Sequence, residues 1–184
     1  MISEFQKLID TSIKYKVDYK QFTKLQKNAL TLLGLNSMNK LRDRFEGQSF
    51  LDKFLLRSYS ELALQNAFGK IVIDDLKKNT IKSYKPDFSL NGLKVEIICS
   101  SNDEYPIVPK GEFELGAVIL VNLHTRETYF VGTVEKKVLD ENLEDKSLSP
   151  LLSKNFSGYL KNFDIILPFK IENFGTDQTE KSIK

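Results

Sequence analysis

The 184-residue chain contains one cysteine, Cys99, one histidine, His124, and no tryptophan. A single cysteine excludes an intrachain disulfide framework and any multi-cysteine metal site. Histidine-based triads and zinc sites are poorly supported as well, since His124 falls in an expected hairpin turn between residues 122 and 127. Cys99 itself is expected to be a small apolar filler and not a nucleophile.

Long apolar runs are also missing. The sequence has no stretch long enough to cross a membrane and no basic-apolar-small leader at its start, so we expect a cytoplasmic protein with no membrane partner. Its hydrophobic share of 41% and charged share of 28% are ordinary for a globular protein. The length suits one hydrophobic core and is short for two full domains.

The charge balance is close to even, with 27 basic and 25 acidic residues. Net charge therefore gives no argument for a nucleic-acid partner, but its distribution does. Residues 1–50 carry nine Lys or Arg against five Asp or Glu, whereas residues 112–184 carry nine against twelve. The candidate contacts to a phosphate backbone are Lys77, Lys78, Lys82 and Lys110. A solvated lysine-rich loop explains the same residues without any partner.

Hydrophobic periodicity predicts an α/β fold with an added N-terminal helical segment. We expect helices in residues 1–48, an α/β core in residues 49–171 and a polar, mobile tail in residues 172–184. The helical segment could contact DNA, form a dimer or cap the sheet. Within the core, Ser49 resembles a helix start, and Gly69 fits the stop that follows Phe68.

Four segments of the α/β core are expected to be strands, apart from the hairpin described below. The continuous apolar run 116–121 is typical of a central strand buried on both faces, and residues 128–134 would return as its hairpin partner. Residues 71–73 and 163–167 would be the first and last strands. Residues 100–116 and 135–162 contain prolines and are expected to be irregular or helical.

The most informative stretch is residues 85–100, where two short strand-forming runs flank Asn91-Gly92. This dipeptide best suits a two-residue type I′ hairpin turn. A two-residue loop fixes the register, so that Leu90 faces Leu93, and Asp87 faces Glu96. The hairpin thus sets two carboxylates side by side.

Carboxylates directly opposed on neighbouring strands have Cβ atoms about 5 Å apart and repel one another. A divalent cation such as Mg²⁺ or Mn²⁺, shared by Asp87 and Glu96, would remove that repulsion. Neutralisation by Lys85 and Lys94 on a solvated sheet face would do the same without a metal.

The arrangement resembles the PD-(D/E)xK nuclease superfamily, which has a restriction-endonuclease-like mixed central sheet flanked by helices. Pro86-Asp87 matches the PD element, and Glu96-Ile97-Ile98 falls where (D/E)-x-K belongs. Family members also carry an acid on a preceding helix, and Glu61 has that position. Ser58 to Glu61 is also a capping-box pattern, so Glu61 could instead cap a restarted helix.

The resemblance implies that Asp87, Glu96 and the Ile97 carbonyl hold the metal, with Glu61 in water-mediated contact. One departure is important, because Ile98 occupies the position of the family's lysine. Lys85, expected directly across from Ile98, is the preferred substitute, and Lys94 and Lys110 are alternatives. Otherwise another group does this work, or the protein no longer cuts.

The function expected from this resemblance is a Mg²⁺-dependent endonuclease acting on DNA, in the manner of a type II restriction enzyme and as a homodimer. Two alternatives stay open. The chain could keep the fold but bind nucleic acid or a partner protein without turnover, which Ile98 favours. It could also be an α/β interaction protein in which the motif is accidental.

Overall fold

A computed structural model describes residues 4–69, 85–144 and 148–168. The helices are α1 (Glu4–Thr11), α2 (Tyr19–Leu32), α3 (Met38–Arg42), α4 (Gly47–Phe68) and α5 (Lys136–Asn142), with short 3₁₀ turns at Leu152–Lys154 and Phe163–Ile165. The strands are β1 (Ile13–Lys16), β2 (Phe88–Leu90), β3 (Leu93–Ser101), β4 (Ile107–Pro109), β5 (Leu115–Asn122), β6 (Glu127–Glu135), β7 (Phe156–Tyr159) and β8 (Leu167–Pro168). The α/β class is confirmed.

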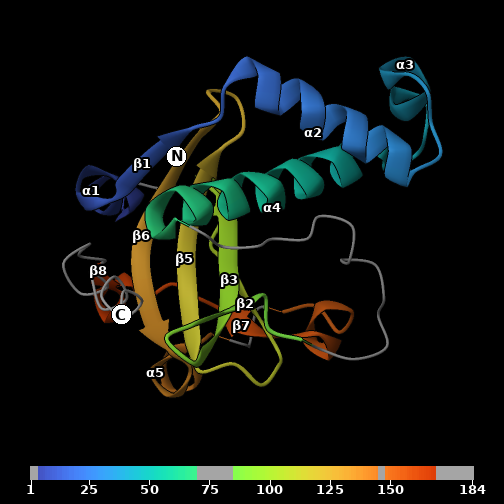
Figure 1. The fold of residues 1–184 in the computed structure, drawn as a ribbon. Coiled ribbons are helices and arrows are strands. Elements are labelled where there is room, and N and C mark those ends of the chain that lie inside the picture. The colour runs from blue at the N-terminus through green and yellow to red at the C-terminus, as the bar shows by residue number, and fades with distance from the viewer. Residues whose placement is uncertain (1–3, 70–84, 145–147, 169–184) are drawn as a thin grey trace, which may run out of the picture.

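Six strands form one mixed sheet in the order β1-β6-β5-β3-β2, with β8 also paired to β6. Strands β3 and β5 are parallel, and the other pairs are antiparallel. Helix α4 lies across the sheet, and α2 and α3 pack on α4 (Figure 1). Strands β4 and β7 make a separate two-stranded sheet.

Strand β5 is buried on both faces, as its unbroken apolar sequence predicts. Ala117, Ile119 and Val121 belong to the core under α2 and α4. Val118 and Leu120 point to the opposite core, which also contains Phe5 of α1 and Leu139 of α5. The predicted hairpin partner is confirmed as β6, and His124 lies in the turn between the two strands.

The structure corrects several expectations about secondary structure. Residues 13–16 form a strand in the central sheet, so the first 48 residues are not wholly helical. Helix α4 begins at Gly47 without a side-chain cap, and so Ser49 does not start it, although its end before Gly69 is as predicted. The strand expected at residues 163–167 is instead a 3₁₀ turn at Phe163–Ile165 followed by the two-residue strand Leu167–Pro168, since only these last two residues pair with β6.

Two further strands, β4 and β7, lie in segments expected to be irregular or helical. They are short and pair with each other and not with the main sheet. They therefore lack the regular apolar alternation by which a longer strand is recognised in a sequence. The expected strand at residues 71–73 and the tail at 172–184 lie outside the described residues, as do Lys77, Lys78 and Lys82.

Candidate functional site

The Asn-Gly hairpin has the predicted register. Phe88 pairs with Val95, Ser89 with Lys94, and Leu90 with Leu93. Asn91 and Gly92 have φ values of 50° and 83°, the pair of positive angles that a type I′ turn requires. Strand β2 begins only at Phe88, so Asp87 stands one residue beyond the paired ladder, next to Glu96.

Asp87 does with its side chain what a longer β2 would do with its backbone. Its Oδ2 accepts a hydrogen bond of 2.7 Å from the backbone N–H of Ile97. The N–H and C=O of one strand residue point to the same side, and an exposed strand edge leaves both without partners. Asp87 therefore satisfies the edge of β3 just where β2 ends.

Arg57 of α4 is the residue that the sequence reasoning missed. Its Nη2 forms an ion pair with Asp87 Oδ1, and its Nη1 donates a 3.1 Å hydrogen bond to the Ile97 carbonyl. The same Nη1 lies 3.9 Å from Glu96 Oε1, and Nε donates to Glu61 Oε1 at 3.3 Å. One guanidinium thus contacts all four groups that the sequence assigned to the metal or its surroundings.

The position of Arg57, one helical turn before Glu61, was the available signal in the sequence. Side chains four residues apart on a helix lie on the same face, so any site that includes Glu61 also meets residue 57. Helix α4 is continuous through residues 58–61, and this rules out the alternative that Glu61 caps a restarted helix.

The three acids differ in their exposure. Glu61 and Glu96 are buried, with 3% and 6% of their surface exposed. The Asp87 and Arg57 side chains are each about a quarter exposed, at 22% and 24%. The cluster therefore opens to solvent at Asp87 and Arg57, while Glu61 and Glu96 form its inner wall.

The lysine candidates are not paired with these acids in the described residues. Within the described residues, neither Lys85 nor Lys94 forms an ion pair with Glu61, Asp87 or Glu96, and both lysines are exposed. The Lys110 ammonium donates to the Ser153 carbonyl at 2.6 Å instead. Ile98 is fully buried against Gly116 in the second core, an apolar position in which an ammonium group would be desolvated.

Cys99 lies beside the cluster and is partly buried against the first core. Burial raises the pKa of its thiol, and the nearby Arg57 guanidinium opposes that rise only in part. The thiol is therefore protonated at neutral pH, which agrees with the expectation that Cys99 fills space and is not a nucleophile.

A magnesium or manganese ion fits the chemistry of this donor set. Carboxylate and carbonyl oxygens are the ligands that such hard cations prefer, and Asp87, Glu96 and Ile97 direct theirs toward one cationic group. No ready-made cluster of three or more His, Cys, Asp or Glu ligands exists in the described parts of the chain. An ion would consequently take two carboxylates and one carbonyl, and Arg57 would have to turn outward.

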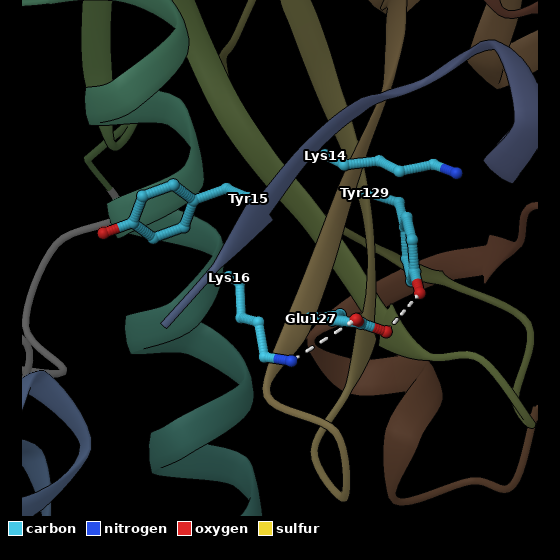
Figure 2. Close-up of a pocket in the computed structure, with 5 residues that line it drawn as sticks. All are labelled: Lys14, Tyr15, Lys16, Glu127 and Tyr129. Carbon is cyan, nitrogen blue, oxygen red and sulfur yellow. Dashed lines mark hydrogen bonds and ion pairs between the residues drawn. The ribbon is translucent and has the colours of Figure 1, made fainter. Parts of the chain in front are cut away.

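A shallow depression of about 250 Å³ lies at the opposite, β1 edge of the sheet (Figure 2). Lys16 lies 3.9 Å from Glu127, and the Tyr129 hydroxyl donates to Glu127 at 3.0 Å. Hydrogen bonds from Thr125 and then Tyr129 hold the pKa of the Glu127 carboxyl below its ordinary value. Lys16, Glu127 and Tyr129 thus form a surface ion-pair network that lines part of the depression.

Comparisons of the chain with protein-family models, with curated proteins and with solved structures found no match. No helix in residues 4–69, 85–144 or 148–168 is long and apolar enough to cross a membrane. In the described residues, the candidate site is the partly open acidic cluster around Arg57, at the β2 edge of a mixed α/β sheet.

Proposed function

We propose that the chain is a metal-dependent endonuclease that hydrolyses DNA phosphodiester bonds on a restriction-endonuclease-like core. One observation carries the proposal. Asp87, Glu96 and the Ile97 carbonyl, which the sequence pattern assigns to a shared Mg²⁺ or Mn²⁺, direct their oxygens toward one guanidinium. Such convergence of oxygen atoms from β3 and from the residue before β2 is what a cation site needs.

Each residue then has a defined task. Asp87, Glu96 and the Ile97 carbonyl bind the ion, which when bound lowers the pKa of a water and offsets charge on the scissile phosphate. Glu61, buried one helical turn after Arg57, positions the guanidinium through its 3.3 Å hydrogen bond. The guanidinium, released toward solvent, binds the scissile phosphate in place of the lysine that Ile98 replaces. It stabilises the negative charge that develops during attack.

Cleavage of supercoiled plasmid DNA with Mg²⁺ or Mn²⁺ tests this function. We expect the wild type to cut and the Asp87→Asn and Glu96→Gln variants to lose at least about 100-fold in rate, roughly 3 kcal/mol of transition-state stabilisation. Glu112→Gln, which removes one exposed loop carboxylate, is the matched control and should cut normally. Absence of cutting by the wild type with either metal contradicts the proposal.

A second candidate is a module that keeps the fold and binds nucleic acid or a protein without turnover. The Arg57 contacts favour it, since the guanidinium already offsets charge on Asp87 and Glu96 as a permanent counter-ion. Calorimetric titration with Mn²⁺ separates the candidates. Heat that disappears in both the Asp87→Asn and Glu96→Gln variants supports the nuclease, whereas no heat in the wild type supports a structural ion-pair network or an accidental motif.

A type II restriction enzyme that acts as a homodimer is the form of this activity that the sequence resemblance implies. Sedimentation of the wild type with and without duplex DNA tests the dimer. A monomer that still cuts would separate the nuclease proposal from the restriction-enzyme analogy.

A further inference from the structure

Helix α2 carries an exposed stripe of one charge. Lys20, Lys24 and Lys27 follow the i, i+4, i+7 spacing that places side chains above one another on a helix. All three are exposed, whereas Leu25 and Ala29 on the opposite side are buried in the core shared with α4. The stripe therefore faces directly away from the body of the protein.

The stripe is unusual because nothing of opposite sign is mixed into it. The 14 residues of α2 include no aspartate or glutamate. None of the three lysines forms an ion pair within the parts of the chain that the structure describes. Solvated helices commonly alternate acidic and basic residues at i, i+4, and α4 has both signs, with Asp52 and Lys53 in its first half.

The geometry points to the sugar–phosphate backbone of duplex DNA as the partner of the lysine stripe, and we propose this contact. Lys20 and Lys27 are about 10 Å apart along the helix axis at 1.5 Å per residue. Phosphates along one strand of a duplex rise about 3.4 Å each along the duplex axis, so the stripe has the length of about three phosphate-to-phosphate steps along that axis.

Helix α2 packs directly on α4, the helix that carries Arg57 and Glu61. A duplex bound along the stripe is thereby held in a fixed relation to the acidic cluster. The choice of DNA rests on the proposed function, whereas the preference for a polyanion rests on the stripe alone. Contacts of this kind are independent of base sequence and would anchor the substrate without specifying a cutting site.

The test measures binding of a fluorescently labelled duplex by anisotropy, in EDTA and over a range of salt concentrations. The triple variant Lys20→Gln/Lys24→Gln/Lys27→Gln keeps good helix formers and removes three charges. We expect its Kd at 0.1 M salt to rise at least tenfold, and the slope of log K against log salt to become shallower by about 2 to 3.

The matched control is Lys7→Gln/Lys137→Gln/Lys154→Gln, which removes three exposed charges scattered over other elements. It should keep most of the affinity and the slope. Equal weakening in the two triple variants would overturn the proposal, as would a wild type that fails to bind duplex even at low salt. Preferential binding of polyglutamate over duplex would assign the stripe to an acidic protein instead.

Lysine acetylation footprinting of the wild type, read by mass spectrometry, makes the result independent of variant folding. Duplex should protect Lys20, Lys24 and Lys27 and leave Lys7, Lys137 and Lys154 reactive. Because no metal is present, binding and protection are measured whether or not the protein cuts. Protection without cleavage would retain the stripe and reject the nuclease, and cleavage without protection would do the reverse.

Discussion

Arg57 contacts four groups of the candidate site at once, and its removal should therefore be felt in stability as well as in activity. Arg57→Met keeps the apolar stem but takes the guanidinium away from three carboxylates and the Ile97 carbonyl. Breaking a fully buried pair costs about 3–5 kcal/mol, and the partial exposure here reduces the expected loss to about 2 kcal/mol. Urea denaturation measures it.

Lys53→Met is the control for this substitution, since Lys53 is an exposed cation one turn earlier on α4. It should change the free energy of unfolding by no more than about 0.5 kcal/mol. A loss in Arg57→Met no larger than in the control would mean that the guanidinium contacts do not stabilise the site.

Tyr59, next but one to Arg57, gives a prediction about alkaline pH. Its side chain is fully buried, its hydroxyl makes no hydrogen bond with the described residues, and burial raises its pKa to about 12. Between pH 10 and pH 12 the folded state keeps the tyrosine proton and the unfolded state loses it. This group's contribution to stability is thus complete below about pH 10 and is lost as the pH rises through 12.

Tyr59→Phe should therefore flatten the alkaline part of the stability profile. At pH 7 it should be neutral or stabilising by up to about 1 kcal/mol, because it removes a buried hydroxyl that has no partner among the described residues. Urea midpoints at pH 7, 9 and 11 measure both effects. A large loss at pH 7 would show that the hydroxyl has a stabilising partner.

The residues of the site divide clearly between those visible in the sequence and those that were not. Asp87 and Glu96 were predictable because the Asn-Gly turn fixes their register locally. The role of Arg57 depends on contacts with residues 30 and 40 positions away, which local patterns do not contain. Lys85 would lie across from Ile98 only if the pairing of β2 with β3 continued past Phe88, and the ladder ends there.

At the scale of elements, strand β1 shows why the N-terminal segment was misread. Ile13–Lys16 is a four-residue strand between two amphipathic helices, too short to interrupt a helical pattern in sequence. Its partner is β6, more than 100 residues later, and Thr128 Oγ1 also donates to the Tyr15 carbonyl at 3.0 Å. Long-range pairing overrode a local helical preference.

The start of α4 depends on one glycine. A Cβ placed on Gly47 would lie far inside contact distance of the Leu41 backbone carbonyl, so α3 and α4 can approach this closely only without a side chain. Gly47→Ala should destabilise the protein by about 3 kcal/mol, since backbone atoms must shift to admit it. Ser49→Ala, two residues later and exposed, is the control and should be near neutral. Thermal unfolding followed by circular dichroism compares the two.

The whole molecule is a sheet with a core on each face, and this arrangement ranks its strands by stability. Strand β5 contributes to both cores and has a neighbour on each side, whereas β2 is a three-residue edge strand. We expect amide hydrogens of β5 to exchange only through global unfolding, with a strong dependence on urea. Those at the β2 edge should exchange through local opening that urea hardly affects.

Ile97 is the amide at which the sheet and the candidate site meet. Its N–H is held by the Asp87 carboxylate at the edge of β3, and its own side chain is buried in the first core. Asp87→Ala should speed exchange of this amide at least tenfold, as measured by NMR, and leave Ala117 and Ile119 of β5 unchanged. Ser89→Ala, on the exposed face of β2, is the matched control. Unchanged protection of Ile97 in Asp87→Ala would mean that the carboxylate does not close the edge of the sheet. In that case Asp87 would be held in the site only through its ion pair with Arg57 of α4.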